Sequence, residues 1–444
     1  MMYVSFIRKK RRVTPPILIA GSFLITIFIG TLLLKLPFAT TIPITWTNAL
    51  FTATSATTVT GLSVFDIGST LTLFGEIVLL TLIQIGGVGL MAFAVAILMI
   101  LGRKVGMKNR IFLQESFSQQ SLGGTVRFLR SILIFVFVTE GLAFIILSFF
   151  WVPEFGLKQG LYYSLFHVIS AFNNAGFSLF PDNLMGFAGD FPVTLILSSL
   201  FIIGGLGFTV VMEVIAKQSP KQWSLHTKIM LAGTLTVNLI ATFLLFVLEY
   251  HNMKTIGSMS IGDKVLTSYF QAVTPRTAGF NMVAMGDMEN SSLLLTLLLM
   301  FIGGGSASTA SGIKLTTFIV IVVATLAYFR GMTEPHLFKR TIKSEIIFRS
   351  LAIAAVSSML VFTAFFLLTI TETLPFLPLL LETMSAFGTV GLSVGITGNL
   401  SPIGEWILCA VMFLGRIGPL TLFFLLIRPK KESFKYSYDR VHTG

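Results

Sequence analysis

The segment LLLETMSAFGTVGLSVG at residues 379–395 begins apolar and ends in small and polar residues around a glycine. Three other segments share this form: TNALFTATSATTVTGLSVFD at 47–66, LYYSLFHVISAFNNAGFSLF at 161–180 and KVLTSYFQAVTPRTAGFNMV at 264–283. Each glycine is followed by a bulky apolar residue and then by Ser or Asn. The aligned glycines are Gly61, Gly176, Gly279 and Gly391. Such repetition at similar intervals indicates an internal fourfold repeat.

The composition of the chain indicates a membrane environment. Of the 444 residues, 54% are hydrophobic and only 11% are charged, whereas soluble domains carry about a quarter charged residues. Apolar runs long enough to cross a ~30 Å hydrocarbon core recur along the chain. We therefore expect an all-α polytopic membrane protein with eight transmembrane helices, near 17–36, 71–101, 130–151, 192–216, 229–249, 292–329, 347–370 and 402–428.

The net charge of +12 follows membrane topology better than it follows nucleic-acid binding. Basic residues precede the first apolar run, occupy alternate connections and fill the C-terminal tail, whereas the intervening connections are mainly acidic. Lys and Arg accumulate in the cytoplasmic loops of membrane proteins. We expect a multi-pass protein with both termini in the cytoplasm and an acidic outer mouth that attracts cations.

A second glycine pattern supports the repeat. The apolar run after each glycine loop contains a cluster: IGGVG at 85–89, IGGLG at 203–207, IGGGS at 302–306 and LGRIG at 414–418. Each repeat is then a helix, a short re-entrant pore helix, a glycine loop and a second helix, because the pore segments are too short to span. We expect four tandem repeats around a pseudo-fourfold pore: 1–110, 111–225, 226–335 with a broken inner helix, and 336–444 with the basic tail.

The four loops have the residues of a cation filter. A cation crossing a membrane exchanges its water for oxygen ligands, and rings of backbone carbonyls supply them without a fixed charge. Glycine adopts the positive φ that such a loop needs at little steric cost. The candidate filter residues are Thr58, Val59, Thr60 and Gly61; Asn173, Asn174, Ala175 and Gly176; Arg276, Thr277, Ala278 and Gly279; and Gly388, Thr389, Val390 and Gly391.

Charged residues near the loops have two readings. Arg276 could tune the filter, or it could point behind the filter into a salt bridge with an outer acidic residue. We favour the salt bridge, because a guanidinium in the conduction path would repel cations. Glu140 and Glu213 lie near the ends of expected helices and are interpreted as surface or interface groups.

Two features predict a gate below the filter. Three glycines followed by small hydroxyl residues cannot form a stable helix, yet they lie about halfway along the span 292–329. Arg416 stands in the middle of the last span, where its charge would oppose cations. The alternatives are close helix packing for the segment and a structural hydrogen bond for the arginine. The candidate gate residues are Gly303, Gly304, Gly305, Ser306, Ala307, Ser308, Thr309, Ala310, Ser311, Gly312, Lys314 and Arg416.

The loops TVTGLS, NNAGFS, TAGFN and TVGLS, together with GGGSASTASGIK, resemble the Trk/Ktr/HKT superfamily of potassium transporters, in particular the membrane subunits of bacterial Ktr systems. The resemblance implies a channel-like K⁺ uptake subunit in the bacterial cytoplasmic membrane. Glycine at all four filter positions goes with K⁺ selectivity in that family, with Na⁺ as an activator or minor substrate. The resemblance also implies a homodimer and a cytosolic ring of nucleotide-binding subunits of the KtrA type. ATP or ADP is then expected on that partner, and no cofactor on this chain.

Other function classes stay open on the residues alone. A secondary transporter coupled to Na⁺ or H⁺ also uses broken helices at membrane depth, although here the breaks are fourfold rather than paired. A purely structural subunit is a further alternative. An enzyme would need paired carboxylates or a Ser/His or His/Glu constellation, and the sequence has no such motif. We expect no enzymatic activity, no catalytic residue and no metal other than transported K⁺.

Overall fold

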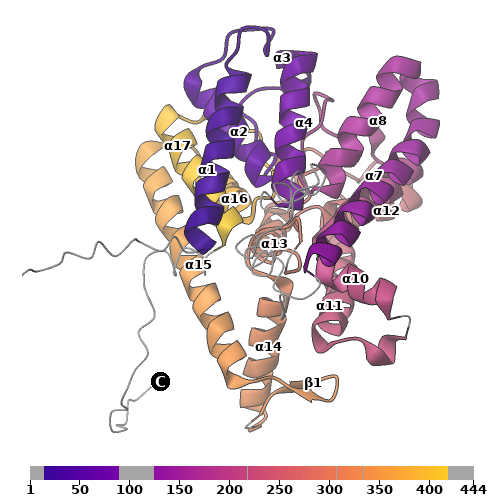
Figure 1. Cartoon of the computed structure of the whole chain (residues 1–444), viewed down its shortest axis with the longest axis vertical. Helices are drawn as coiled ribbons and strands as arrows, with labels where there is room; N and C mark the ends of the chain where they lie inside the picture. Colours follow the sequence, from indigo (N-terminus) through magenta and orange to yellow (C-terminus); the bar gives the residue numbers. More distant parts are fainter. Residues whose placement is uncertain (1–14, 90–124, 218, 307, 333, 419–444) are drawn as a thin grey trace, which may run out of the picture.

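The computed structural model describes residues 15–89, 125–217, 219–306, 308–332 and 334–418, and this part of the chain is mostly helical (Figure 1). The strands of this part form one antiparallel pair, β1 (His336–Leu337) with β2 (Arg340–Thr341). The expected all-α membrane fold is confirmed at this level.

The helices fall into four successive groups along the chain. The first group holds α1 (Pro15–Leu34), α2 (Trp46–Thr58), α3 (Ile67–Thr70) and α4 (Leu73–Val88). The second holds α7 (Thr125–Phe155), α8 (Leu157–Phe172), α9 (Phe191–Leu206) and α10 (Phe208–Ala216). The third holds α11 (Leu225–Glu249), α12 (Ile261–Val273), α13 (Asn290–Phe301) and α14 (Leu315–Phe329). The fourth holds α15 (Ser344–Thr371), α16 (Phe376–Gly388) and α17 (Pro402–Ile417). Short 3₁₀ turns lie at Met185–Phe187, Pro220–Gln222, Met285–Asp287 and Thr397–Asn399.

Long apolar helices begin each group. Within the described residues α1, α7, α11 and α15 are long and apolar enough to cross a membrane, and α9 with α10 would make a fifth span if the bent pair counts as one. Their outward side chains are apolar; Phe149 on α7 and Phe362 on α15 are 73% and 69% exposed. Exposed apolar faces of this extent are typical of contact with lipid.

In three groups, the helix that follows the glycine loop ends earlier than the sequence predicts. α4, α9 and α17 stop at the last glycine of their clusters, and the φ angles there are positive: Gly89 at 93°, Gly207 at 102° and Gly418 at 88°. Because helical residues have negative φ, a residue with φ near +90° ends the helix. The span expected at 192–216 is therefore two helices at 95°, and the extensions expected to 101 and 428 lie outside the described residues.

The groups pack in a closed cycle. In each group the long first helix contacts the short helix that follows: α1 with α2, α7 with α8, α11 with α12 and α15 with α16. The helix that follows the glycine loop contacts the short helix of the next group: α4 with α8, α9 with α12, α13 with α16 and α17 with α2. This cycle brings the loops after the four short helices toward one another.

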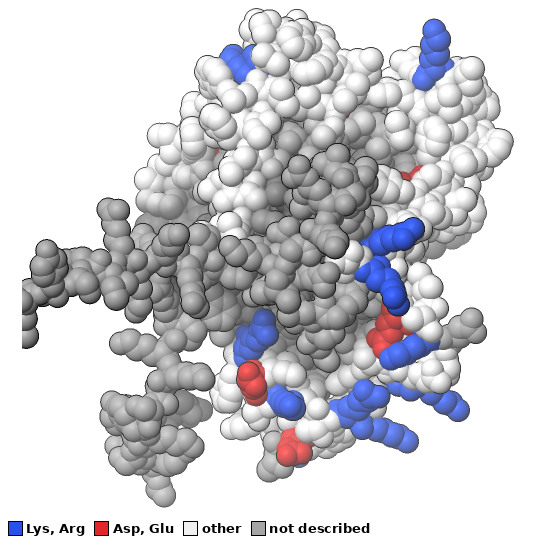
Figure 2. Space-filling view, viewed as in Figure 1, with Lys and Arg blue, Asp and Glu red and all other residues white. Residues whose placement is uncertain are grey.

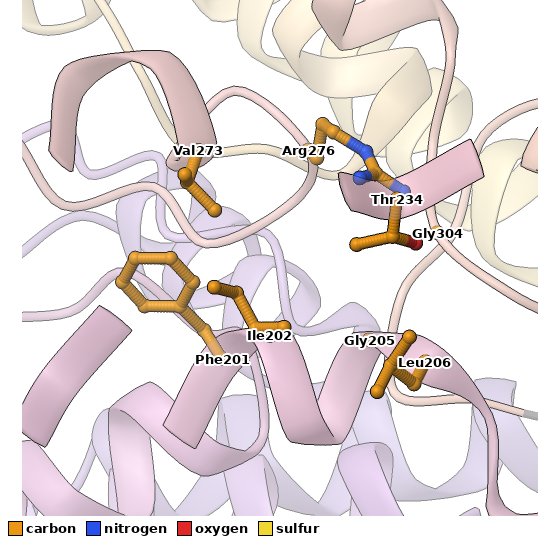
Figure 3. A pocket seen from close by; sticks show the side chains of 8 residues that line it. All are labelled: Phe201, Ile202, Gly205, Leu206, Thr234, Val273, Arg276 and Gly304. Atoms are coloured by element: carbon orange, nitrogen blue, oxygen red, sulfur yellow. The ribbon is translucent and has the colours of Figure 1, made fainter. Parts of the chain in front are cut away.

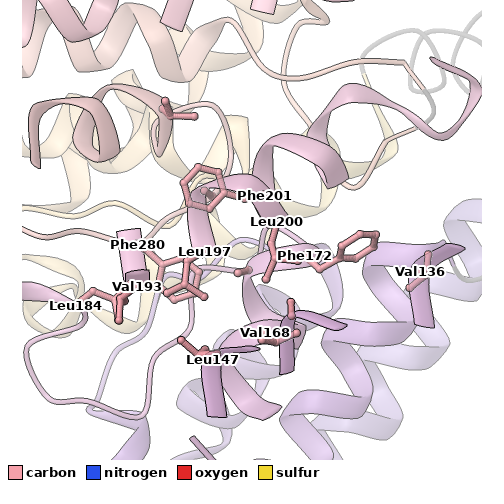
Figure 4. Packing of buried hydrophobic residues seen from close by; sticks show 14 of the residues in the cluster. Val136, Leu147, Val168, Phe172, Leu184, Val193, Leu197, Leu200, Phe201 and Phe280 are labelled. Atoms are coloured by element: carbon pink, nitrogen blue, oxygen red, sulfur yellow. The ribbon is translucent and has the colours of Figure 1, made fainter. Parts of the chain in front are cut away.

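Buried apolar side chains anchor those loops. The bulky residue after each repeated glycine is buried, with exposures of 1% for Leu62, 2% for Phe177, 0% for Phe280 and 1% for Leu392. Figure 4 shows Phe280 packed with Leu197 of α9, in a cluster that also includes Leu147 of α7 and Val168 of α8. Relative to exposure to water, full burial of such a side chain contributes about 1.5–3 kcal/mol. The apolar position seen in the sequence therefore fixes each loop to the protein interior.

Lys and Arg gather at one end of the face shown in Figure 2. In Figure 1 that end carries α10, the start of α11, α14 and β1. The connection between α10 and α11 contains Lys217 and Lys221, and that between α14 and α15 contains Arg330, Lys339 and Arg340.

Candidate functional site

The four repeated glycines form a closed ring, which we call the glycine ring. A Cβ built on any of them would come within 2.9 Å of the carbonyl oxygen of the residue that precedes the next glycine. The pairs are Gly61 with Ala175, Gly176 with Ala278, Gly279 with Val390, and Gly391 with Thr60. The last pair returns to the first loop. No side chain fits at any of these positions, so the close approach of the four backbones requires glycine.

The backbone has the same form in all four loops. The residue two positions before each glycine has a positive φ: Val59 58°, Asn174 59°, Thr277 83° and Thr389 47°. The glycines follow at 93°, 68°, 78° and 93°. The alternation of positive and negative φ turns successive carbonyls to one side of the chain. Positive φ is strained for β-branched residues, and such strain clusters at functional sites.

Hydroxyl side chains hold the loops to the short helices. Ser55 Oγ and Ser385 Oγ accept hydrogen bonds from the amides of Gly61 and Gly391, at 3.1 and 3.0 Å. Ser170 Oγ donates instead to the carbonyl of Phe177, at 2.8 Å. These are the serines of the repeated Ser-Ala pair.

The third loop lacks the Ser-Ala pair, and sequence comparison of the loops did not find its replacement. Thr274 Oγ1 donates to the carbonyl of Phe280 at 2.6 Å, as Ser170 does for Phe177. Thr274 lies one residue nearer to its glycine than the serines do. A search for any hydroxyl residue in this window, rather than for Ser-Ala, would have found it.

One side of the glycine ring opens into a hollow of about 280 Å³. Residues from all four loop regions line it, including Ser63, Asn183, Asn281 and Ser393, and Asp182 is the acidic residue among them. A water molecule takes about 30 Å³ of liquid volume, so the hollow has room for a hydrated cation.

Between α13 and α14 the chain leaves the helical path and folds back on itself. We call residues 302–314 the broken segment; residue 307 lies outside the described part. Ile302 and Ile313 form a bridge, and the amide of Gly303 donates to the carbonyl of Ile313 at 2.8 Å. A Cβ on Gly303 would overlap the carbonyl oxygen of Ser311. The two ends of the segment are therefore adjacent, and its middle projects as a closed loop.

The broken segment docks on the glycine cluster of α9. The amide of Gly305 donates to the carbonyl of Gly205 at 2.7 Å, and that of Thr309 to the carbonyl of Gly204 at 3.3 Å. Thr309 Oγ1 also donates to Asn174 Oδ1 at 2.8 Å. Since Asn174 is two residues from Gly176, the segment lies directly against the glycine ring.

Arg416 ties the broken segment to the first group. Its guanidinium donates to the carbonyl of Thr309, to Ser311 Oγ at 3.2 Å and to the carbonyl of Gly86 on α4. These partners are neutral, so the guanidinium charge is not cancelled. Lys314 Nζ adds a second cation at the segment, donating to the carbonyl of Ala310 at 2.8 Å.

Arg276 lies behind the glycine ring, without the salt bridge that the sequence suggested. Its Nη1 donates to Asn238 Oδ1 of α11 at 3.0 Å, and it makes no ion pair with any described residue. Figure 3 shows its guanidinium beside Thr234, at a cavity of about 20 Å³ that Gly205 and Gly304 also line. A cavity of that size holds one water. The side-chain amide of Asn238, rather than a carboxylate, therefore supports the Arg276 guanidinium.

The reading of Glu140 as a helix-end surface group is wrong. Glu140 lies in the middle of α7, is 7% exposed, and accepts hydrogen bonds from Gln84 at 3.2 Å and Asn173 at 3.1 Å. It braces the second loop from behind, so Asn173 turns away from the ring. Sequence spacing could not pair α4 with α7. Glu213 lies near the end of α10 as expected but is partly buried; it pairs with Lys217 at 2.7 Å and accepts hydrogen bonds from Ser224 and Thr227 at the start of α11.

The structure thus separates the predicted filter residues. The glycines and the two residues before each of them lie together in or next to the ring. Thr58 and Gly388 end the short helices α2 and α16, and Asn173 and Arg276 point behind the loops. The described residues of the predicted gate all lie in the broken segment or, for Arg416, within hydrogen-bonding distance of it.

Comparison with known proteins identifies the family. Residues 14–436 match the family TrkH, described as cation transport protein. The Ktr system potassium uptake protein B of Bacillus subtilis (strain 168) is 52% identical over 433 residues, 98% of this chain and 97% of that protein. The protein of the same name from Vibrio alginolyticus is 43% identical, over 98% of this chain and 96% of its own length.

A solved structure supports the same fold. The potassium transporter TrkH from Vibrio parahaemolyticus matches with a TM-score of 0.71 at 21% identity, over 95% of this chain and 86% of that one. These relatives are transport proteins rather than enzymes. The chain therefore belongs to the TrkH family of cation transport proteins, as the four loops and the broken segment suggested.

Proposed function

We propose that this chain is a potassium uptake transporter of the Ktr type, and that K⁺ moves through the glycine ring down its electrochemical gradient. The observation that carries the proposal is the closure of the ring. Four segments far apart in the sequence each place a glycine against the carbonyl oxygen of the next loop, around one point. Backbone oxygens so placed can replace the water around a monovalent cation and still release it.

The identity of the cation rests on two supports. Both relatives named above are potassium uptake proteins by name, and all four ring positions carry glycine, which goes with K⁺ selectivity in the family that the sequence resembles. We propose K⁺ as the main substrate, with Na⁺ as an activator or minor substrate.

We propose that the four groups are four pore repeats, 1–110, 111–225, 226–335 and 336–444, with eight membrane spans. Each short helix would be re-entrant, since it is apolar but ends at the ring. The basic end seen in Figure 2 would face the cytoplasm, with both termini. The hollow lined by Ser63 and Asp182 would then be the outer entrance.

We propose that the broken segment and Arg416 form the gate. The segment docks beside the ring, is bonded to α9 and to Arg416, and contains the small residues that allow it to rearrange. Arg416 and Lys314 place two positive charges beside the path, and a cation leaving the ring would meet their repulsion. Movement of the segment would remove both the obstruction and the partners that hold Arg416.

We propose that the chain works as a homodimer with a cytosolic nucleotide-binding ring of the KtrA type. The name "Ktr system" of the relatives supports a multi-component assembly. ATP or ADP would bind that ring, and this chain would carry no cofactor of its own.

Ion flux into liposomes that contain the purified chain tests the proposal. We expect K⁺ and Rb⁺ to enter much faster than Na⁺ and Li⁺, in proportion to the imposed gradient. To exclude a closed gate as the cause of low flux, the same assay is run on a variant shortened within residues 305–311. If the shortened, folded protein passes none of the four ions, the proposed function is wrong.

Gly61→Ser tests the ring itself. The added side chain would overlap the carbonyl of Ala175 and demand a φ of 93° from serine. Strain of about 1–3 kcal/mol should distort one oxygen of the ring and lower the K⁺/Na⁺ flux ratio about tenfold. Gly21→Ser is the matched control, because a Cβ at Gly21 meets nothing within 4 Å. Equal K⁺/Na⁺ ratios in the two variants would count against the ring as the filter.

A further inference from the structure

The side chain of Asn174 lies between the broken segment and the third loop. Its Oδ1 accepts a hydrogen bond from Thr309 Oγ1 at 2.8 Å, and its Nδ2 donates to Thr277 Oγ1 at 3.2 Å. The exposures of the three residues are 2% for Asn174, 1% for Thr277 and 1% for Thr309. Water therefore has little access to replace these bonds.

Both loop residues in this chain of hydrogen bonds have positive φ angles, and that of Thr277 is strained. Thr277 has a φ of 83°, which is an outlier for a β-branched residue and needs support from its surroundings. Asn174 supplies part of that support through its amide. At the equivalent positions of the first and fourth loops, Val59 and Thr389 have side chains without an amide group. Thr389 Oγ1 is buried without a hydrogen-bond partner among the described residues.

The hydrogen-bonded side chains of Thr309 and Asn174 are packed tightly against α9. A Cβ on Gly204 would lie 3.0 Å from Asn174 Oδ1 and 3.1 Å from Thr309 Oγ1, so the pair fills the space over α9. The amide of Thr309 is bonded to Gly204 as well. Among the hydrogen bonds of the described residues, the bond from Thr309 to Asn174 is the one through which a side chain of the broken segment reaches a ring loop.

We infer that Asn174 is a positioning residue that couples the broken segment to the glycine ring. With the segment docked, Thr309 orients the Asn174 amide onto Thr277, and the second and third loops are held in the form that binds K⁺. When the segment leaves, the amide loses Thr309 and the two loops relax. The ring then holds K⁺ less tightly as the path below it opens, which favours release of the ion.

This inference rests on the proposed function, because it assigns regulation to the same ring. Equilibrium ion binding tests it without requiring an open gate. The apparent affinities of the full-length chain for K⁺ and Na⁺ are measured from the salt dependence of its melting temperature, since a ligand that binds only the native state stabilises it by an amount that grows with the logarithm of the ligand concentration over its dissociation constant. The readout is the ratio of the two affinities, not the melting temperature itself.

Thr309→Val removes the donor and keeps the shape of the side chain. We expect the K⁺/Na⁺ affinity ratio to fall about two- to tenfold, the range for loss of one neutral hydrogen bond. Thr296→Val on α13 is the matched control: it makes the same change at a buried hydroxyl that has no hydrogen-bond partner among the described residues, so the affinity ratio should stay at the wild-type value. A Thr309→Val ratio equal to the wild-type ratio, or matched by Thr296→Val, overturns the inference.

Thr277→Val completes the test. It removes the acceptor at the other end of the same hydrogen-bonded chain, so its effect and that of Thr309→Val should be less than additive in the double variant. Strictly additive effects would overturn coupling through Asn174. If the wild-type chain shows no stabilisation by K⁺ at all, the proposed function fails, which is distinct from K⁺ binding that Thr309→Val does not change.

Discussion

The first glycine of the cluster packs differently in the third group than in the other three groups. In the other three, the first glycine lets the end of the short helix rest on the second helix. A Cβ there would overlap a carbonyl oxygen at that end, in the pairs Gly86 with Thr57, Gly204 with Phe172, and Gly415 with Phe387. In the third group, Gly303 packs on Ser311 of its own broken segment. One pattern therefore supports a fixed ring in three places and a separate loop in the fourth.

The residues that follow the second and third clusters explain the difference between these two. After IGGLG the chain reads FTVVMEVIA and resumes as α10 at once. After IGGG it reads SASTASG, whose small and hydroxyl residues favour local hydrogen bonds to the backbone over a helix. A glycine cluster alone thus marks close packing, and the residues after it decide whether the chain resumes as a helix or leaves the helical path.

Removal of the broken segment should have the largest effect. The adjacent ends at Gly303 and Ile313 allow residues 305–311 to be deleted without pulling α13 and α14 apart. We expect K⁺ flux into liposomes to rise by about a hundredfold or more, corresponding to about 2.8 kcal/mol, because the deletion removes the obstruction itself as well as the bonds that hold it. A folded deletion variant with unchanged flux would mean that the segment only packs, like the other clusters.

Arg416→Ala should have the next largest effect. It removes the bonds to Thr309, Ser311 and Gly86 and the positive charge beside the path. The segment itself stays, so we expect a smaller rise in K⁺ flux, about tenfold, corresponding to about 1.4 kcal/mol. Arg349→Ala on the exposed face of α15 is the control for loss of a positive charge. Equal flux in the two variants would show that Arg416 does not contribute to the closed state.

The features that sequence reasoning found and those it missed differ in the physics that sets them. The glycines, the apolar residues after them and the interruption at residues 302–314 follow from local conformation and spacing, which a sequence records directly. The choice of Asn238 as the partner of Arg276, and the contact of Gln84 with Glu140, depend on which helices become neighbours in the cycle. Thr274 takes the place of the loop serine although it lies one residue nearer to its glycine. A hydroxyl can reach the carbonyl of the residue after the glycine from either position.

The helix ends at Gly89 and Gly207 were missed for a related reason. A third glycine in a hydrophobic run is compatible with a continuous helix as well as with a left-handed end, and the surrounding contacts decide between them. The uninterrupted span expected at 192–216 is therefore not what the structure shows, whereas the interruption expected within 292–329 is present. The bend of 95° between α9 and α10 is where the expected continuity fails most clearly in the described residues.

The same substitution at equivalent glycines should separate packing from gating. Gly204→Ala would push a Cβ into the carbonyl of Phe172 and displace α8 from α9; such overpacking costs about 1–3 kcal/mol. Gly303→Ala would instead open the neck of the broken segment at Ser311. We expect a lower melting temperature for Gly204→Ala, and raised K⁺ flux with a smaller loss of melting temperature for Gly303→Ala. The reverse pattern would contradict the contrast between the groups.

Gly205→Ala should have the smallest effect, and it should raise the melting temperature where Gly204→Ala lowers it. It is the neighbour of Gly204 in α9, yet a Cβ there meets only Asn174 Nδ2, at 3.6 Å, which is ordinary contact. Alanine lowers the conformational entropy of the unfolded chain relative to glycine, a gain of about 0.4–1 kcal/mol where the backbone suits it. We expect a slightly higher melting temperature and an unchanged K⁺/Na⁺ flux ratio. A large loss of stability would mean that both glycines are needed for packing, and that the cluster, rather than its first residue, holds the short helix in place.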